Sequence, residues 1–151
     1  MINVTKSYLP NIEKYKNYID EIYKTAWLTN QGPLVQRLET RLAQYLGVKN
    51  IVLVSNGTIA LEIAYRALDL KGEVITTLFS FVSTTSSLLT NRLTPIFVDI
   101  DEKTFNLSPE NIEEKITSKT SAILPVHVFG NACEVEEIEK IAKKSNLKVI
   151  Y

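Results

Sequence analysis

Along the first third of the chain, hydrophobic residues recur every three or four positions, which is the spacing of an amphipathic helix. One such stretch runs from Asn11 to about Ala26, and its apolar positions are Ile12, Tyr15, Ile19, Ile22 and Tyr23. A second begins at Pro33, a residue suited to the first helical turn, and ends before Gly47, which suits the left-handed position after a helix. Residues 1–50 are therefore predicted to form an N-terminal helical segment.

From residue 51 onward the pattern changes to short apolar runs that are separated by helical stretches. Five runs are predicted to be strands, at residues 51–54, 73–77, 94–100, 122–128 and 147–151. Runs that are apolar on both faces and separated by helices indicate parallel strands that are covered on two sides. The predicted fold class is therefore α/β, with a mostly parallel sheet and helices on both of its faces.

Capping residues mark the helices between these runs. Gly72 is expected to end the helix before the second run, and Ser108 with Pro109 is expected to start another helix. The stretch 134–146 carries acidic residues in its first turn and lysines in its last, which matches the helix dipole. Each predicted strand in this half of the chain is thus followed or preceded by a helix.

Composition and charge exclude several classes of partner. Seventeen basic and seventeen acidic residues cancel among 151, which leaves no basic excess for binding nucleic acid or an anionic membrane. The single cysteine, Cys133, cannot form a disulfide within the chain and is expected to be an ordinary thiol. Residues 1–16 lack the apolar stretch of a signal peptide and no run reaches membrane-spanning length, so a cytoplasmic protein is expected.

The sequence SNGT, at 55–58, follows the first predicted strand and opens a helix, where unpaired backbone amides can bind an anion. Gly57 allows close approach or a positive φ, and the Thr58 hydroxyl can cap the helix or contact a phosphate oxygen. A tight turn with an N-cap and no ligand explains the same residues. Since the stretch lacks a Walker lysine and the three glycines of a dinucleotide fingerprint, nucleoside triphosphates and NAD are disfavoured.

Two further candidate positions follow later strands. Phe79 and Phe81 alternate with small hydroxyl residues, so an aromatic ring can lie over a flat heterocycle, although core packing is the commoner role of phenylalanine. His127, the only histidine, follows the fourth predicted strand, and most such histidines are structural. No nucleophile triad or metal-ligand spacing surrounds it, so no metal site is expected.

These loops occur in a characteristic order: SNGT, then TTLFSFVST, then PVHVFG, with WLTNQGPLVQRLE before them and TPIFVDIDEKTFNLSPENIEEKI between the last two. In that order they resemble the DegT/DnrJ/EryC/StrS family of nucleotide-sugar aminotransferases, which are pyridoxal-phosphate enzymes of the aspartate-aminotransferase fold (fold type I). The resemblance covers nearly the whole chain. Within the family, the sequence is most similar to enzymes that form dTDP-4-amino-4,6-dideoxyglucose. The resemblance implies that residues 51–151 are an incomplete large domain that binds pyridoxal phosphate.

The resemblance also assigns roles to individual residues. A cup for the cofactor phosphate is implied by the amides of Thr58 and Ile59 with the Thr58 hydroxyl, next to Gly57. Phe81 matches the aromatic residue that stacks on the pyridine ring, and His127 faces the ring's phenolic-oxygen edge or the substrate. The entrance for the sugar nucleotide is bordered by residues of the 27–32 loop: Trp27, Thr29, Asn30 and Gly32. Two positions depart from the family pattern: Leu78 is usually proline and Ser83 usually alanine.

Transamination also needs an acid at the pyridine nitrogen and a lysine that holds the cofactor as a Schiff base. In the family both follow the position of Tyr151, so residues 1–151 are expected to be inactive alone and to be part of a longer enzyme. The complete enzyme is expected to be a homodimer that transfers an amino group from glutamate to a nucleotide-linked keto-deoxysugar such as dTDP-4-keto-6-deoxyglucose. Its pathway would make surface-polysaccharide (O-antigen) or antibiotic sugars. Two alternatives to an aminotransferase remain. The chain is a non-catalytic relic or binding module of the same fold, or the complete enzyme is a pyridoxal-phosphate-dependent sugar dehydratase.

Overall fold

The computed structural model describes residues 5–151. Residues 1–4, part of the stretch 1–16 that lacks the apolar run of a signal peptide, lie outside the described residues. Contacts within the chain divide it into two compact units, one ending at Leu53 and the other running from Val54 to Tyr151. Each unit is described on its own.

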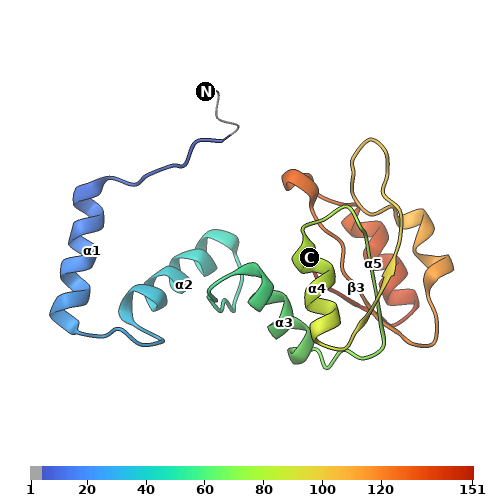
Figure 1. The fold of residues 1–151 in the computed structure, drawn as a ribbon, viewed down its shortest axis with the longest axis horizontal. Helices are drawn as coiled ribbons and strands as arrows, with labels where there is room; N and C mark the ends of the chain where they lie inside the picture. The colour runs from blue at the N-terminus through green and yellow to red at the C-terminus, as the bar shows by residue number, and fades with distance from the viewer. Residues whose placement is uncertain (1–4) are drawn as a thin grey trace. The chain divides into compact units, whose positions relative to one another are not determined.

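The first unit contains the two predicted helices, α1 (Ile12–Thr25) and α2 (Pro33–Leu46), at the blue and cyan end of the chain in Figure 1. Asn11 caps α1, because its side-chain oxygen accepts the amides of Glu13 and Lys14 at 3.0 and 3.1 Å. Gly47, with a φ of 66°, ends α2 in the left-handed conformation, as the sequence predicts. Both helices thus begin and end at residues that the pattern identifies.

The second unit contains a sheet of four parallel strands in the order β2-β1-β3-β4. Their bounds are β1 (Glu73–Thr76), β2 (Thr94–Phe97), β3 (Thr120–Ile123) and β4 (Lys148–Val149). Since all four run in the same direction, their carboxyl ends lie at one edge of the sheet. This edge is where ligands bind in open α/β sheets.

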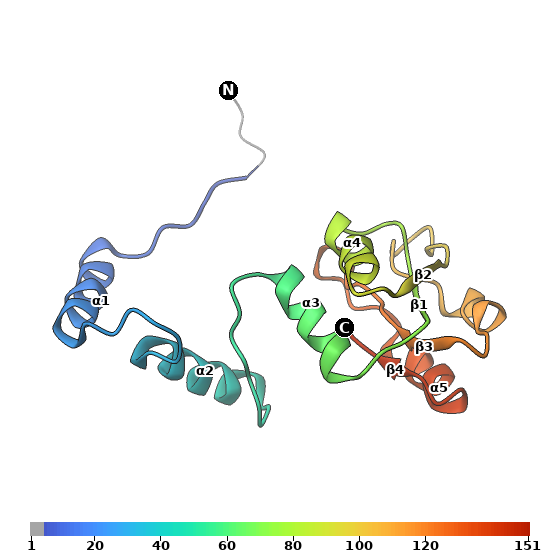
Figure 2. The same cartoon turned by 60° about the horizontal axis from the view of Figure 1, so that its bottom comes forward.

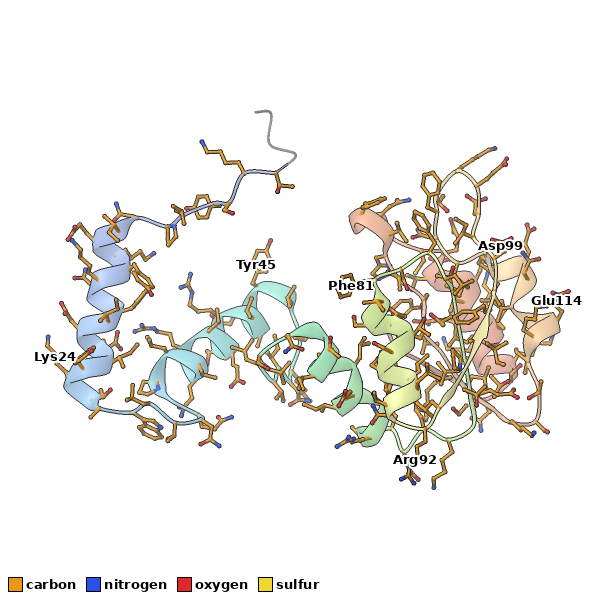
Figure 3. The ribbon with its side chains drawn as sticks, in the orientation of Figure 1. Lys24, Tyr45, Phe81, Arg92, Asp99 and Glu114 are labelled. Carbon is orange, nitrogen blue, oxygen red and sulfur yellow. The ribbon has the colours of Figure 1, made fainter. Side chains whose placement is uncertain are left out.

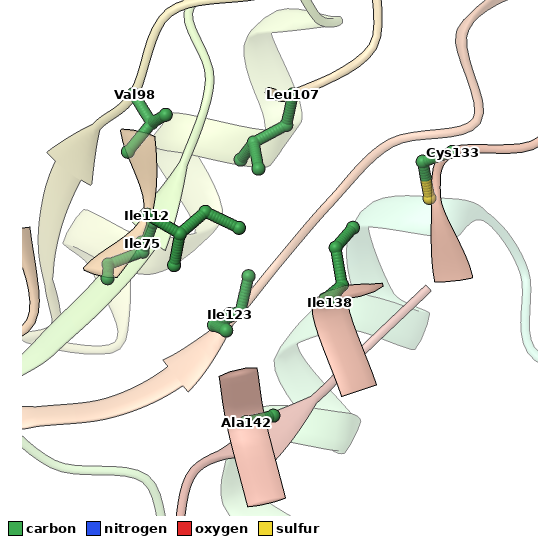
Figure 4. Packing of buried hydrophobic residues seen from close by; sticks show 8 residues of the cluster. All are labelled: Ile75, Val98, Leu107, Ile112, Ile123, Cys133, Ile138 and Ala142. Atoms are coloured by element: carbon green, nitrogen blue, oxygen red, sulfur yellow. The ribbon is translucent and has the colours of Figure 1, made fainter. Parts of the chain in front are cut away.

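Helices cover both faces of this sheet, which confirms the predicted α/β class (Figure 2). Val74 and Ala122 pack against α3 (Gly57–Ala67) and α4 (Val82–Thr90), with Tyr65 and Leu88 in the same cluster. The alternate residues of the strands, Ile75 and Ile123, point to the other face. There they pack with α5 (Val135–Lys144) in a cluster completed by Val98, Leu107, Ile112, Cys133, Ile138 and Ala142 (Figure 4).

The first predicted strand, 51–54, does not form among the described residues, where no strand pairs with it. A strand needs a neighbour that takes its amides and carbonyls, and an apolar run does not supply one. In this chain a side chain takes one of the amides instead. The carboxylate of Glu39 accepts the Leu53 N–H at 3.0 Å.

Other boundaries also differ from the prediction. β2 ends at Phe97 instead of residue 100, because its neighbour β1 ends at Thr76, which pairs with Phe97. β4 is confined to Lys148–Val149 instead of 147–151, because Val149 pairs with Ile123, the last residue of β3. The stretch that begins at Pro109 forms two single 3-10 turns, η1 (Pro109–Asn111) and η2 (Glu113–Lys115), instead of an α-helix. The Ser108 side chain makes no capping bond there, and so short a segment has little to offset the cost of starting an α-helix. β3 ends at Ile123 instead of continuing to residue 128, because Pro125 has no N–H to donate to a neighbouring strand.

Gly72 does not end a helix, because α3 already stops at Ala67. Instead, Gly72 has a φ of +75° and directly precedes β1. A Cβ at this position would overlap the backbone carbonyl of Lys119, just before β3. Glycine is therefore required here for the close approach of two chain segments as well as for the positive φ.

Candidate functional site

The loops that follow β1 and β3 meet at the carboxyl edge of the sheet. β1 and β3 are hydrogen-bonded neighbours, so the residues after Thr76 lie beside the residues after Ile123. Figure 3 shows Phe81 and Asp99, which follow β1 and β2, at one end of the unit and Arg92, which precedes β2, at the opposite end. The candidate residues are therefore placed where strand ends gather.

A cavity of about 410 Å³ opens between these two loops. Its walls come from one stretch after β1 and one after β3: Leu78, Phe79, Ser80, Phe81, Val126, His127, Val128 and Phe129. Two residues that the sequence singled out from distant positions, Phe81 and His127, thus line one cavity. The Phe81 side chain is 75% exposed, so it is not a core residue, and its ring is available to a ligand.

The other aromatic residues of the cavity contact one another. The ring of Phe79 stacks on that of Phe105 with 5.5 Å between centroids, and it meets the ring of Phe129 edge-on at 6.5 Å. Phe129 has a φ of 54° inside the single turn η3 (Val128–Gly130). Phe105 lies outside the cavity lining, whereas Phe79, Phe81 and Phe129 belong to it, and Phe81 makes no aromatic contact among the described residues.

The ring of His127 is held from two sides. Its Nδ1 accepts the backbone N–H of Cys133 at 3.1 Å, and the ring of Tyr151 stacks on it with 5.3 Å between centroids and 7° between planes. Burial raises the pKa of the Cys133 thiol, and partial burial raises the pKa of the Tyr151 phenol. Both groups therefore stay protonated around neutral pH.

The corner at 55–59 has a different cap from the expected one. Asn56, not Thr58, caps α3: its Oδ1 accepts the Ile59 N–H at 3.0 Å. Asparagine is extended here and reaches three residues ahead, the usual geometry of an N-cap, whereas Thr58 already lies in the first turn. One of the two amides expected at a phosphate is therefore already bonded.

The amides of Gly57 and Thr58 donate to no group among residues 5–151. Gly57 does not have a positive φ, so that reason for a glycine is wrong. An added Cβ at Gly57 would meet nothing within 4 Å, so the corner is open to a ligand. Gly57, Thr58 and Ile59 do not line the aromatic cavity.

The corner at 55–59, which begins α3, and the loop with Phe81, which precedes α4, lie at the same edge of the sheet. The Tyr65 hydroxyl is 3.1 Å from Ser87 Oγ, and Arg66 donates to Asn91 at 3.0 Å, so the last turns of the two helices lie side by side. Their first turns, which begin at Gly57 and Val82, therefore point the same way. Helices on a parallel sheet run opposite to the strands, which places these N-termini at the carboxyl edge.

The 27–32 loop of the first unit has a defined shape. The indole N–H of Trp27 donates to the carbonyl of Asn30 at 3.1 Å. Trp27, Thr29 and Gly32 line a small cavity of about 110 Å³ between the ends of α1 and α2. All four residues expected at a substrate entrance thus belong to one short loop, in which a hydrogen bond links Trp27 to Asn30.

Asn106 stabilises the loop that follows His127, a role that the sequence does not predict. Its side chain is buried and bonds to three backbone groups of the loop that carries His127: it accepts from Val128 and donates to Asn131 and Ala132. An asparagine in a loop, here between Phe105 and Leu107, is indistinguishable in sequence from an ordinary turn residue. The described residues hold no cluster of three or more His, Cys, Asp or Glu that could bind a metal.

Across residues 5–151, no helix is both long and apolar enough to cross a membrane. Every buried side-chain nitrogen or oxygen of that part of the chain has a hydrogen-bond partner. The buried side-chain polar groups of the second unit are therefore all hydrogen-bonded within the chain.

Sequence comparison gives the same family as the motifs. The profile of the DegT/DnrJ/EryC1/StrS aminotransferase family matches residues 11–151. The chain is 52% identical over 150 residues to dTDP-4-amino-4,6-dideoxy-D-glucose transaminase of Escherichia coli, and 38% identical over 146 residues to GDP-perosamine synthase of E. coli O157:H7. These alignments cover 99% and 95% of the chain, which spans about 40% of the length of the curated relatives it matches.

Solved structures agree with the sequence relatives. One is DesI in the presence of its TDP-sugar product, with a TM-score of 0.89 and 34% identity over 92% of this chain and 36% of that one. Another is NtdA from Bacillus subtilis with bound cofactor PMP, with a TM-score of 0.88 and 37% identity over 91% of this chain and 32% of that one. The expected fold, the N-terminal part of an aspartate-aminotransferase-like large domain, is confirmed.

Proposed function

Because the chain belongs to the DegT/DnrJ/EryC1/StrS aminotransferase family, we propose that the complete protein is a pyridoxal-phosphate-dependent aminotransferase acting on a nucleotide sugar. The observation that carries the proposal is the shared cavity of Phe81 and His127 at the carboxyl edge of the sheet. In this proposal, residues 1–50 form the helical segment and residues 51–151 form part of the large domain.

The residues present fit the cofactor. A cavity of about 410 Å³ lies within the usual range for small-molecule sites, and the exposed Phe81 ring offers a flat apolar surface to a heteroaromatic ring. The open N-terminus of α3 offers the Gly57 and Thr58 amides to a phosphate. When bound, pyridoxal phosphate supplies an electron sink for a carbanion at the amino-acid or sugar carbon.

Each residue has a definite role in this proposal. Phe81 orients the cofactor ring by stacking, and His127 offers a polar hydrogen to an oxygen of the ring or the substrate. The amides of Gly57 and Thr58 and the Thr58 hydroxyl bind the phosphate. The Ile59 amide joins them only if the Asn56 cap opens, because that amide has one hydrogen and Asn56 now accepts it.

The substrate is proposed from the relatives. Two relatives at 52% and 53% identity, from E. coli and Shigella dysenteriae, are named dTDP-4-amino-4,6-dideoxy-D-glucose transaminases, whereas the GDP-perosamine synthases are 38% identical or less. We therefore propose dTDP-4-keto-6-deoxyglucose as the acceptor and glutamate as the donor. The turn of Trp27, Thr29, Asn30 and Gly32 is proposed to border the nucleotide-sugar entrance. A cytoplasmic homodimer in surface-polysaccharide or antibiotic-sugar synthesis fits these roles.

The test uses the full-length protein. Incubation with pyridoxal phosphate should give a visible absorption band that survives dialysis and is removed by borohydride. With glutamate, the dTDP-linked keto-sugar should be converted to an amino sugar faster than its GDP-linked counterpart. Absence of the band would contradict the cofactor. A product that has lost a hydroxyl group and carries no new amino group would indicate the dehydratase reaction instead.

A further inference from the structure

The imidazole of His127 is bound at one nitrogen by a group that can only donate. Its Nδ1 lies 3.1 Å from the backbone nitrogen of Cys133, and a backbone N–H has no acceptor capacity. Nδ1 must therefore be the unprotonated nitrogen of the ring. The hydrogen of the neutral imidazole is then on Nε2.

The thiol of the same residue favours the same tautomer. Cys133 Sγ is also 3.1 Å from His127 Nδ1, and the cysteine is only 4% exposed. Burial raises the pKa of this thiol, so it remains an S–H group, which can share the lone pair of an unprotonated Nδ1. Two donors of Cys133 thus meet one nitrogen of His127.

The other nitrogen is left for a ligand. Among residues 5–151 no group bonds to His127 Nε2, while the ring itself lines the cavity with Phe81. Tyr151 stacks on one face of the ring and limits its rotation. The polar hydrogen that His127 can offer to the cavity is therefore the one on Nε2.

Asn106 fixes the loop that brings Cys133 to His127. It is 3% exposed, and its Oδ1 accepts the Val128 N–H at 2.9 Å. Its Nδ2 donates to the carbonyls of Asn131 and Ala132 at 3.2 and 3.1 Å. One side chain therefore bonds to the loop immediately after His127 and immediately before Cys133.

The loop needs this support because its backbone is strained. Phe129 has a φ of 54° and Gly130 a φ of 81°, and a bulky residue in the left-handed region costs free energy. Three hydrogen bonds from a buried amide offset such a cost. Without them the loop can relax, and the Cys133 amide is no longer held against the imidazole.

We propose that Asn106 is a positioning residue that holds His127 as the Nε2–H tautomer, so that a fixed hydrogen-bond donor faces the cavity of Phe81. The donor suits an anionic or carbonyl oxygen. The identity of that oxygen, on the cofactor ring or on the substrate, rests on the proposed function. The tautomer itself does not, since it follows from contacts within the chain.

The test is a long-range ¹H–¹⁵N correlation spectrum of the imidazole in full-length protein without cofactor, with the His127 signals assigned by their loss in His127→Gln. A single tautomer with hydrogen on Nε2 is expected. In Asn106→Ala and Asn106→Asp the two tautomers should both be populated, whereas Asn111→Ala, an exposed asparagine without a side-chain hydrogen bond among the described residues, should keep the wild-type spectrum. Folding is checked for each variant by circular dichroism.

A pair of His127 variants reports on the donor separately. The amide nitrogen of glutamine reaches the position of Nε2, while that of asparagine reaches only the position of Nδ1. Where the oxygen belongs to the cofactor ring, His127→Gln should keep pyridoxal-phosphate affinity within about threefold, and His127→Asn should lose about tenfold, the value of one hydrogen bond to a charged acceptor. Where it belongs to the substrate, the same difference should appear in the KM for the nucleotide sugar, and equal values of both quantities in the two variants would overturn the donor role of Nε2.

The outcomes separate the two proposals. Hydrogen on Nδ1, a wild-type mixture of tautomers, or an unchanged spectrum in a folded Asn106 variant would overturn the inference. Failure of both Asn106 variants to fold would make that residue purely structural and would also overturn its positioning role. A single Nε2–H tautomer in a protein that binds no pyridoxal phosphate would support the inference and contradict the proposed function.

Discussion

The side-chain oxygen of Asn56 accepts the backbone N–H of Ile59 at 3.0 Å and closes the first turn of α3. The same amide is one of those expected to bind a phosphate. Helix capping and anion binding therefore compete for one hydrogen, and an anion at this corner meets the amides of Gly57 and Thr58 first.

Removing this cap should separate the two roles. Asn56→Ala is expected to lower the free energy of unfolding by about 1 kcal/mol, because the Ile59 amide loses its partner. Affinity for pyridoxal phosphate should stay equal or increase, since that amide becomes free. Urea denaturation and a spectroscopic titration of the cofactor measure the two effects.

Asn11→Ala is the matched control, because Asn11 caps α1 in the same way. It should cost similar stability and leave cofactor affinity unchanged. A tenfold loss of affinity in Asn56→Ala would mean that the asparagine itself contacts the phosphate.

Phe81 should matter for binding and little for folding. Because its side chain is 75% exposed, Phe81→Ala should change the free energy of unfolding by no more than about 0.5 kcal/mol. Loss of a stacking surface should weaken cofactor binding by up to about tenfold, which corresponds to roughly 1.4 kcal/mol. Phe81→Tyr should retain the affinity.

Phe105→Ala serves as the control for the stacking prediction. The substitution removes the ring that stacks on Phe79, and Phe105 itself does not line the Phe81 cavity. An unchanged dissociation constant in Phe81→Ala, or an equal loss in Phe105→Ala, would place the cofactor ring elsewhere.

Gly72 and Gly47 allow a clean measurement of steric overlap. Both have a positive φ, of 75° and 66°, but an added Cβ overlaps the Lys119 carbonyl only at Gly72 and meets nothing within 4 Å at Gly47. Gly47→Ala should cost about 1 kcal/mol from backbone strain alone, and Gly72→Ala at least about 2 kcal/mol. The midpoints of urea denaturation give the comparison, and equal losses would refute it.

The thiol of Cys133 should be slow to react in the folded protein. Burial raises its pKa, so iodoacetamide should alkylate the folded chain at a higher pH than the urea-unfolded chain. Because the pKa of the Cys133 thiol is higher in the folded than in the unfolded protein, its contribution to the free energy of unfolding is complete below the unfolded-state pKa. That contribution is lost as the pH rises through the folded-state pKa. Cys133→Ala should remove that part of the alkaline destabilisation. Equal alkylation rates for folded and unfolded protein would contradict the burial effect.

Local patterns were sufficient where the structure is local. Helices α1 and α2 follow from apolar spacing, Pro33 and Gly47, because propensity and caps act within a few residues. Residues 51–54 show the limit: their apolar run predicts a strand, but strand formation depends on a neighbour elsewhere in the chain. The extent of β3 was missed for a local reason, the proline at 125, that was visible in the sequence.

The site was predictable to a similar degree. The positions of Phe81 and His127 after strands of one parallel sheet indicate a common edge, and the cavity brings the two together. Asn106 could not be identified, because its role depends on backbone groups more than twenty residues away. The sequence places the N-cap of α3 at Thr58, but the structure places it at Asn56, two residues earlier. A shift of this size is within the usual uncertainty of a helix start.

The strand order β2-β1-β3-β4 has a consequence for biosynthesis of the protein. β1 is synthesised first but lies inside the sheet, and its neighbour β3 begins only at Thr120. While the ribosome translates the intervening segment, β1 can pair on one side only, and part of its apolar surface stays uncovered. An unpaired strand edge and uncovered apolar surface favour aggregation at that stage, and the Phe81 cavity forms only after residue 129 has left the exit tunnel.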